Sequence, residues 1–497
     1  MKKFVVVLFL VIVQANLFAI ESFRWAADAE SNAPYIFQDA KNPSILKGFE
    51  YDIANALARR MNMKAIHVQN QWDGLIPGLS RGDYVAVING IEVTEDRKRE
   101  VLFSIPYYYT FEQLVVRTND YKINKLEDLR GKAVGALKNS LAERILRDID
   151  YIQLRSYEGE VNAFEDLANG RIDAALVDYP IALYYTAIHP ELKMVGEPFG
   201  EVVYAIAFHP NNPKLLERVN LALAEMINSG EMREILEKWN LWNSVLANKW
   251  GDFSQKIYPK TEWENFIKNH TLGVNFIERL ERYIAVLPLF GQATLVTLSL
   301  SIISMILAIL LGTILAIVKI FAPKTLSIAA TSIIEIIRGT PLLIQLFIIF
   351  YALPGIGIKL SPMLAAILGL GVNYAAYEAE NYRAGLLAIA RGQMEAALAL
   401  GMGRRQALRH IIIPQSIKIV IPPITNDFIS LLKDSSLVSV ITMVELTKVY
   451  NQVAATYFDY LGTGIIVAII YLLIGLPFVR LAKYFEKRYG MKELKTN

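Results

Sequence analysis

The residue types that usually carry catalysis are scarce or badly spaced in this chain. It contains no cysteine, which excludes disulfides, thiolate metal sites and cysteine nucleophiles. Gly131-Lys132-Ala133 lacks both the leading glycine and the hydroxyl residue of a phosphate-binding P-loop. The histidines follow no metal-ligand spacing; they are His67, His189, His209, His270 and His410. The sequence therefore predicts neither an enzyme nor a bound cofactor or metal, and any ATP hydrolysis has to come from a separate chain.

Two pairs of opposite charges stand inside strongly apolar stretches. Glu335 and Arg338 lie three positions apart, as do Glu380 and Arg383, so each pair shares one face of a helix. Ionisable groups are costly inside a membrane and have to pair or line an aqueous path. The pairs therefore fit either a gate on a translocation path or salt bridges that hold a helical bundle together.

The elements that carry these residues divide the chain into an exported half and a membrane half. Residues 1–20 combine Lys2-Lys3, an apolar run and Leu17-Phe18-Ala19, which is typical of a cleavable signal peptide; the alternative is an uncleaved anchor helix. Residues 21–243 alternate helix-like stretches, such as 51–61 and 215–239, with short β-rich runs, such as 85–88 and 174–177. This order predicts an α/β domain with a largely parallel sheet. Residues 244–285 are a connector, in which 274–283 fits an amphipathic helix at the membrane surface or a solvated linker helix.

Residues 286–490 form the predicted membrane domain. Its apolar spans are at about 287–318, 327–353, 362–390, 417–432 and 462–480. Five spans after an exported N-terminus put the C-terminus in the cytoplasm, and lysine and arginine gather on that side, as the positive-inside rule expects. The net charge of +3 gives no indication of nucleic-acid binding. We expect a multi-pass protein of the bacterial inner membrane whose N-terminal domain is periplasmic or extracellular.

Four ordered segments of the exported half resemble the periplasmic polar-amino-acid-binding proteins, such as those for histidine, glutamine and lysine/arginine/ornithine. They are Gly48–Ala54, Trp72–Leu79, Asn89–Arg97 and Phe103–Tyr108. The resemblance covers residues 22–242 and implies two lobes that close on the ligand. Lobe one would take about residues 21–115 and 203–243, and lobe two about residues 116–202. The crossover strands would lie near Leu114–Arg117 and Val203–Phe208.

The resemblance also implies how a zwitterionic ligand is held. Arg97 matches the arginine that clamps the ligand carboxylate, since a guanidinium supplies a bidentate fork. Asp178 matches the carboxylate that binds the ammonium group, and Trp72 replaces an aromatic that stacks on the ligand side chain.

Further pocket positions follow from the same resemblance. Asn89 and Gly90 fall in the segment that donates backbone N–H groups to the ligand carboxylate. Ser140 begins a helix whose N-terminus adds donors. Asp28 follows the first strand and is either a pocket residue or a turn or helix cap.

Three positions depart from the family pattern. Glu92 stands where relatives carry Thr or Ser, Asn32 where some carry an aromatic, and Leu141 where a hydroxyl residue is usual. If Glu92 faces the cleft, the carboxylates outnumber Arg97 and favour a cationic side chain. If Glu92 instead pairs with Arg97 or with a residue of lobe two, its role is structural.

The membrane half resembles the histidine/glutamine-type ABC permeases over about residues 288–488. Arg338–Gln345 reads R-G-T-P-L-L-I-Q, Tyr377–Gly385 carries Ala379-Glu380 and Arg383-Ala384-Gly385, and Leu431–Leu437 reads L-L-K-D-S-S-L. Residues 391–415 resemble the cytoplasmic EAA loop that docks on a separate ATPase. The residues that match or flank this motif are Glu395, Ala396, Ala397, Gly401, Arg404, Arg405, Arg409 and Ile411–Pro414, with Ile413 in place of the usual Leu.

Together these resemblances imply an ABC importer subunit in which receptor and permease are fused. Its cargo would be a polar, basic amino acid, and its partners two ATPase subunits, a second copy of this chain and membrane lipid. A ligand-gated channel would insert its pore within the binding domain and leave the EAA loop unexplained. A sensory receptor would need a kinase or a methyl-accepting helix pair after the membrane, and the sequence has neither.

Overall fold

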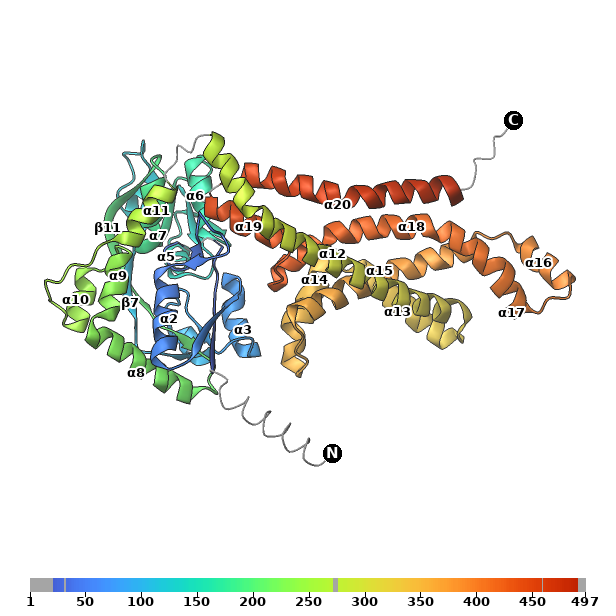
Figure 1. Cartoon of the computed structure of the whole chain (residues 1–497), viewed down its shortest axis with the longest axis horizontal. Coiled ribbons are helices and arrows are strands. Elements are labelled where there is room, and N and C mark those ends of the chain that lie inside the picture. Colours follow the sequence, from blue (N-terminus) through green and yellow to red (C-terminus); the bar gives the residue numbers. More distant parts are fainter. Residues whose placement is uncertain (1–20, 31–32, 271–275, 458, 490–497) are drawn as a thin grey trace, which may run out of the picture. The chain divides into compact units, whose positions relative to one another are not determined.

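The computed structural model of the chain describes residues 21–30, 33–270, 276–457 and 459–489 (Figure 1). The predicted signal peptide, residues 1–20, and the pocket candidate Asn32 lie outside the described residues. The chain forms two compact units. One comprises Met1–Val286 and Gln452–Asp459, and the other Leu287–Asn451 and Tyr460–Asn497.

The first unit contains two five-stranded sheets. The first has the order β4 (Lys64–Gln69), β1 (Ser22–Ala27), β5 (Ala86–Val87), β12 (Ala207–Phe208), β6 (Leu102–Phe103). The second has the order β11 (Leu192–Tyr204), β7 (Tyr108–Arg117), β10 (Ala174–Asp178), β8 (Ala133–Leu137), β9 (Gln153–Tyr157). In each sheet three strands run parallel, and the strands that follow the crossovers pair antiparallel to their neighbours. The domain is therefore α/β with two lobes, one built on each sheet.

Helices pack on both sheets of this unit. Those of lobe one are α2 (Phe49–Arg60), α3 (Leu75–Arg81), α4 (Glu95–Glu100), α8 (Pro213–Ser229) and α9 (Glu231–Lys238). Those of lobe two are α5 (Leu141–Arg147), α6 (Glu160–Ala168) and α7 (Tyr179–Ile188), and α10 (Ser244–Trp250) and α11 (Thr261–His270) follow later in the chain. The spacing of Ile53, Ala54 and Leu57 gives α2 one apolar face, and all three side chains are fully buried.

The chain passes between the lobes twice, once between β6 and β7 and once between β11 and β12. β7 pairs with β10 from Glu112 to Val116. Most of Leu114–Arg117, where the resemblance placed the first crossover, therefore lies within the sheet of lobe two. The second crossover follows Tyr204, within the segment Val203–Phe208.

A short two-stranded sheet of the first unit pairs β2 (Phe37–Gln38) with β3 (Leu46–Lys47). After α11 the described elements are helical, and nine of them are α-helices. They are α12 (Phe276–Phe321), α13 (Lys324–Gly339), α14 (Leu342–Phe347), α15 (Pro362–Leu387), α16 (Arg391–Ala399), α17 (Arg404–Ala407), α18 (Ile413–Asp434), α19 (Leu446–Tyr457) and α20 (Tyr460–Tyr489). Ile306, Leu310 and Ile317 of α12 are each more than half exposed. Side chains of this kind on a helix surface are typical of contact with lipid.

Two of these helical stretches, Ile277–Phe321 and Tyr460–Arg488, are long and apolar enough to cross a membrane singly. The second predicted span is bent: Lys324–Gly339 and Leu342–Ile356 meet at 104° around Thr340 and Pro341, as in a broken span or a re-entrant loop. α15 and α18 have 26 and 22 residues, about 39 and 33 Å of helix, but they are more polar. The five-span topology stays a prediction.

Candidate functional site

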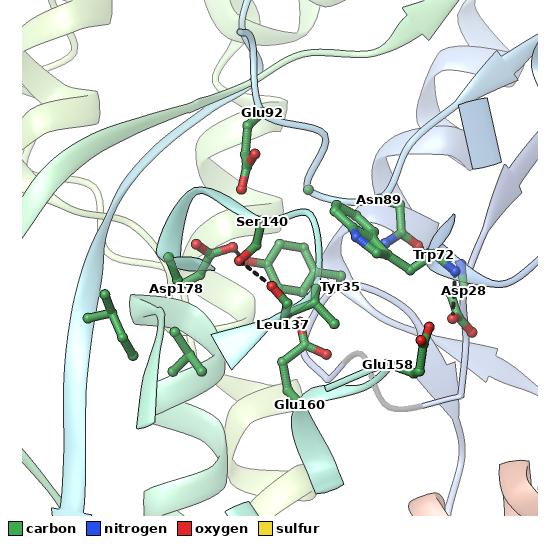
Figure 2. A pocket seen from close by; sticks show the side chains of 14 residues that line it. Asp28, Tyr35, Trp72, Asn89, Glu92, Leu137, Ser140, Glu158, Glu160 and Asp178 are labelled. Atoms are coloured by element: carbon green, nitrogen blue, oxygen red, sulfur yellow. Dashed lines mark hydrogen bonds between the residues drawn. The ribbon is translucent and has the colours of Figure 1, made fainter. Parts of the chain in front are cut away.

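A cavity opens between the two lobes of the first unit (Figure 2). Its volume is about 560 Å³, counting the space open to solvent. The lining residues come from the ends of strands and the starts of helices in both lobes; they are Asp28, Tyr35, Trp72, Asn89, Gly90, Glu92, Leu137, Ser140, Ala142, Glu158, Glu160, Leu176, Val177 and Asp178. The cavity thus contains every described pocket candidate except Arg97.

The lining is acidic. Five carboxylates face the cavity, those of Asp28, Glu92, Glu158, Glu160 and Asp178, whereas none of its described lining residues is a lysine, arginine or histidine. Glu158 is exposed and pairs with Lys138 at 3.0 Å. Within the described part of the chain, Asp178 and Glu160 form no ion pair with a basic side chain. An arrangement of this kind favours a positively charged occupant.

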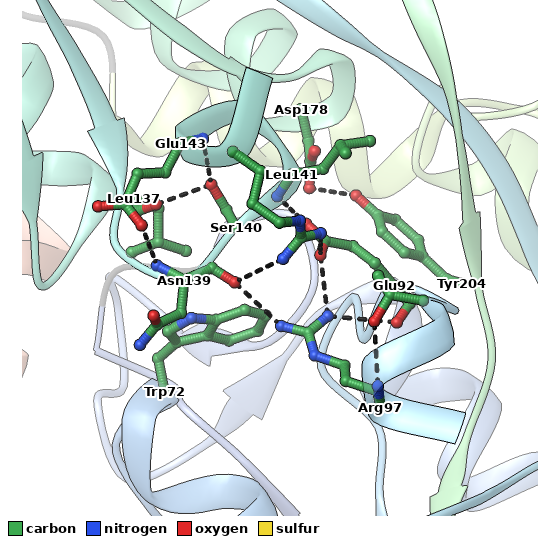
Figure 3. Close-up of polar contacts among 12 residues, drawn as sticks. Trp72, Glu92, Arg97, Leu137, Asn139, Ser140, Leu141, Glu143, Asp178 and Tyr204 are labelled. Carbon is green, nitrogen blue, oxygen red and sulfur yellow. Dashed lines mark hydrogen bonds and ion pairs between the residues drawn. The ribbon is translucent and has the colours of Figure 1, made fainter. Parts of the chain in front are cut away.

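Arg97 is turned toward Glu92 (Figure 3). Thr94 caps α4 by accepting the backbone N–H of Arg97 at 3.2 Å, which holds Arg97 in the first turn. Its Nη1 donates to Glu92 Oε2 at 2.8 Å, and its Nη2 donates to the Asn139 carbonyl of lobe two at 3.1 Å. Both ends of the guanidinium fork are therefore occupied by the protein itself.

Glu92 also reaches lobe two. Its Oε2 accepts from Arg144 Nη2 at 2.7 Å, and its Oε1 accepts the backbone N–H of Leu141 at 2.7 Å. Leu141 is the first residue of α5, whose N-cap Ser140 accepts the N–H of Glu143 at 3.1 Å. Glu92 thus lines the cavity and pairs with Arg97 and lobe two at the same time, which joins the two alternatives that the sequence left open.

The other lobe-one candidates are held by hydrogen bonds within the domain. The carboxylate of Asp28 accepts the N–H groups of Glu30 and Trp72, at 3.1 and 3.0 Å, and the backbone N–H of Asp28 donates to Asn89 Oδ1 at 2.6 Å. Asp28 is therefore both a lining residue and a turn cap. The indole N–H of Trp72 donates to the Lys138 carbonyl of lobe two at 3.0 Å, which leaves the ring to face the cavity.

Gly90 has a φ of +59°, a conformation that favours glycine. Its backbone N–H donates to Glu50 Oε1 at 2.7 Å rather than into the cavity. The hydroxyl of Tyr107 donates to the same oxygen. Burial raises the pKa of Glu50 to about 8.

Asp178 ends β10 and is the centre of a buried hydroxyl and carboxyl cluster. Its Oδ2 accepts hydrogen bonds from Tyr35, at 3.3 Å, and from Tyr204. Glu112, fully buried, is its cross-strand partner on β7. Burial, and after it the charge of Glu92, raises the pKa of Asp178, and burial with the charge of Asp178 raises the pKa of Glu112. The cluster therefore holds protons more tightly than exposed carboxyls do, and a bound cation would favour its ionised form.

Glu160 completes the acidic lining. In the view of Figure 2 it lies between Asp178 and Asp28. Burial, followed by the charges of Asp178 and Asp28, raises the pKa of Glu160 to about 8. Carboxyl groups therefore extend along the cavity and are not confined to one end, and a bound cation would favour their ionised form.

The membrane unit contains a cavity of its own, of about 900 Å³ counting the space open to solvent. Arg338 lines it together with Asp427 and Asp434, and its guanidinium lies 5.1 Å from the ring centre of Tyr377. Glu335 is not among its lining residues. Neither Asp427 nor Asp434 was singled out by sequence spacing.

The second charged pair forms a three-membered ion cluster. Glu380 contacts Arg383 at 2.8 Å on its own helix and Lys319 of α12 at 2.6 Å. Because this cluster ties α12 to α15 and lines none of the described cavities, its geometry favours the salt-bridge alternative over a gate.

The predicted ATPase-coupling residues lie at the surface of the membrane unit. Glu395 and Ala396 of α16 are exposed, as are Arg404 and Arg405, whereas Ala397 is buried. α16 ends at Ala399, and Gly401, two residues further on, has a φ of +81°, which is typical of a helix terminus. Next to it, Leu400 is 83% exposed.

Several cavity residues gave no signal in the sequence. Tyr35, Glu158 and Glu160 line the cavity, Tyr204 bonds to Asp178, and Arg144 bonds to Glu92. No sequence motif links these residues to the ones that they contact, because the contacts are made across sheets and lobes. Only the pairing of lobes by the fold brings them together.

Comparison with known proteins gives two family matches. Residues 25–241 match the bacterial extracellular solute-binding proteins, family 3, and residues 308–491 match the binding-protein-dependent transport system inner membrane component. No single relative among those described here accounts for both halves.

Each half has curated relatives. ABC transporter arginine-binding protein 1 of Escherichia coli (strain K12) is 30% identical over 245 residues, which is 48% of this chain and 99% of the relative. A probable glutamine ABC transporter permease protein of Bacillus subtilis (strain 168) is 36% identical over 192 residues, 39% of this chain and 89% of the relative. The structure of an ancestral arginine-binding protein bound to arginine has 35% identity and a TM-score of 0.42, covering 44% of this chain and 97% of that one.

The two matches follow one another along the polypeptide without overlap. The first contains the cavity between the lobes and the second contains most of the helical unit. The chain therefore belongs to the polar amino acid ABC transporters, as a fusion of a family 3 solute-binding domain with a binding-protein-dependent permease domain.

Proposed function

We propose that the chain imports a basic ligand of the amino-acid class, meaning a basic amino acid or the amine related to it. The observation that carries this proposal is the cavity itself, which five carboxylates line and no described basic residue enters. A cation taken from water needs compensating charge. Asp178, Glu160 and Asp28, which form no ion pair with a basic side chain in the described part of the chain, supply it when ionised. The names of the arginine-binding relatives are consistent with a basic cargo.

The permease cavity supports the same sign of charge. Asp427 and Asp434 line it against the single guanidinium of Arg338. Asp427 accepts a hydrogen bond from Asn381 at 2.8 Å, and Asp434 accepts one from Tyr374 at 2.6 Å. Carboxylates placed in this way would stabilise a cation on a path through the membrane unit.

In this proposal the binding domain lies outside the cytoplasmic membrane and residues 391–415 lie inside it. A separate ATPase would dock on the exposed surface of Glu395, Ala396 and Leu400. Two copies of the chain with two ATPase subunits would form the transporter. Because the receptor is covalently joined to its permease, the captured ligand is always within reach of it.

A titration of the full chain in lipid nanodiscs tests the cargo. All six tryptophans lie between residues 25 and 263, so tryptophan fluorescence reports on the first unit and not on the membrane unit. Trp72 lines the cavity and should respond directly. We expect saturable signals from basic amino acids or small amines and none from glutamate or aspartate. Tight binding of the acidic amino acids alone would overturn the proposal.

A further inference from the structure

Three donors that could hold a carboxylate converge at one end of the cavity, and we call them the carboxylate seat. They are the guanidinium of Arg97 in lobe one, the guanidinium of Arg144 in lobe two and the backbone N–H of Leu141 at the start of α5. Two guanidinium groups and a helix N-terminal N–H form a strong receptor for a carboxylate.

The seat is already filled by the protein. The Glu92 carboxylate accepts from all three donors at 2.7–2.8 Å and is itself only 4% exposed. A ligand carboxylate could enter only by expelling that of Glu92. The expelled carboxylate would then be buried without a partner, beside Asp178 and within an acidic lining, which is a costly state.

The other donors near the seat are committed too. The Gly90 N–H donates to Glu50, the Ser140 hydroxyl donates to the Leu137 carbonyl at 2.7 Å, and the Tyr35 hydroxyl donates to Asp178. The second Nη atom of Arg97 donates to the Asn139 carbonyl. The described lining therefore offers a ligand mainly the carboxyl groups of Asp178 and Glu160. That of Asp28 lies among them and already accepts the N–H groups of Glu30 and Trp72.

We infer that this cavity binds an organic cation without a carboxylate group, such as the amine counterpart of a basic amino acid, with Glu92 taking the place of the missing carboxylate. The inference rests on the proposed import of a basic ligand and narrows its chemical class. Asp178, Glu160 and Asp28 would hold the cationic groups, and the ring of Trp72 offers them an aromatic face.

Matched pairs of ligands that differ only in the α-carboxylate provide the test. The pairs are lysine and cadaverine, ornithine and putrescine, and arginine and agmatine. Each is titrated by tryptophan fluorescence against the full chain in nanodiscs, and calorimetry confirms the stoichiometry. For the unmodified chain we expect the amine to bind about 30-fold or more tightly than the amino acid of the same pair. The factor is that found for other buried charge pairs that lose a partner. An amino acid that binds as tightly as its amine would overturn the inference.

Glu92→Thr removes the carboxylate that occupies the carboxylate seat. With Arg97 and Arg144 left unpaired, the preference within each pair should shift toward the amino acid by about 30-fold or more. Glu92→Gln, which keeps the shape and an acceptor for the Leu141 N–H, should shift it in the same direction. Thermal melting followed by tryptophan fluorescence shows whether each variant is folded. A folded Glu92→Gln chain with the original preference would contradict the assignment.

Two arginines of α5 test whether the amino-acid affinity depends on the carboxylate seat or on positive charge in general. Arg144 crosses to Glu92, whereas Arg147, on the same helix, pairs with Glu143 of its own lobe at 3.1 Å. Added to Glu92→Thr, Arg144→Gln should remove most of the gained amino-acid affinity, and Arg147→Gln should leave it. Equal losses from both would contradict a specific seat. If a folded chain bound neither member of any pair, the basic cargo itself would be refuted and the inference with it.

Discussion

At the scale of single residues, Glu92 shows both the reach and the limit of sequence reasoning. The family pattern identified it as a departure and identified Arg97 as its neighbour in the motif. Its partner Arg144 lies 52 positions away in the other lobe. Spacing arguments do not extend across two sheets, so the sequence left open whether Glu92 faces the ligand or the protein. In the fold, Glu92 lines the cavity and bonds to Arg97 and Arg144 at the same time.

The buried carboxyl clusters follow the same rule. Glu50, Glu112 and Glu160 have raised pKa values because the fold removes them from water. Within their own segments they look like ordinary helix or strand residues. Burial of a charge is a property of the assembled domain, and composition alone could not predict it.

Glu50 allows a direct test of this burial. Its folded pKa of about 8 lies well above the ordinary value of 4.5. The native state therefore binds more protons than the unfolded state between these values, and the stability of the domain falls as pH rises from about 4.5 to 8. Glu50→Gln should flatten this fall and raise the melting temperature above pH 8, because the amide oxygen can still accept from Gly90 and Tyr107. Tryptophan-fluorescence melting of the full chain at pH 5, 7 and 9 measures how the melting temperature changes with pH.

The matched control for Glu50 is Glu217→Gln, which changes an exposed carboxyl of α8. It should leave the pH profile unchanged. Part of the slope should remain in Glu50→Gln, since Glu112, Glu160 and Asp178 contribute with the same sign. A Glu50→Gln chain with the same profile as the unmodified one would show that Glu50 is ionised in the fold.

At the scale of elements, periodicity located most of what the structure contains. The predicted helix 51–61 corresponds to α2, and the runs at 85–88 and 174–177 correspond to β5 and β10. The predicted helix 215–239 is two helices, α8 and α9, because Gly230 with a φ of +80° ends the first. Likewise the apolar stretch 327–353 is bent at Thr340 and Pro341, a break that hydropathy does not detect.

The prediction at this scale concerns Gly401, which follows the end of α16. Gly401 has a φ of +81°, so Gly401→Ala places a side chain in a strained backbone at a cost of about 1 kcal/mol. If α16 docks on an ATPase, ligand uptake by cells that express the variant should fall, while ligand binding by the purified chain stays unchanged. The control is Gly403→Ala, since the φ of Gly403 is −67° and any residue adopts it. Full uptake by Gly401→Ala would remove the coupling role.

At the scale of the whole molecule, the chain consists of a binding unit and a permease unit, each with its own cavity and each matched by its own family. The sequence predicts a boundary between them because the compositions of the two halves differ so strongly. The number of membrane crossings does not follow from composition in the same way. Charged and small residues in α15 and α18 lower their hydropathy, and only packing within a bundle would offset the cost of placing them in lipid.

The natural absence of cysteine makes the topology directly measurable. Single cysteines can be placed at Lys359, between the second and third predicted spans, and at Arg404, in the predicted cytoplasmic loop; both side chains are exposed. In spheroplasts, whose cytoplasmic membrane is intact, a membrane-impermeant maleimide should label Lys359→Cys and not Arg404→Cys. Permeabilised cells should show both, because only the membrane protects Arg404 in the five-span arrangement. Labelling of both positions in intact cells would mean that residues 362–390 do not cross the membrane, and the loop 391–415 could then not reach a cytoplasmic ATPase.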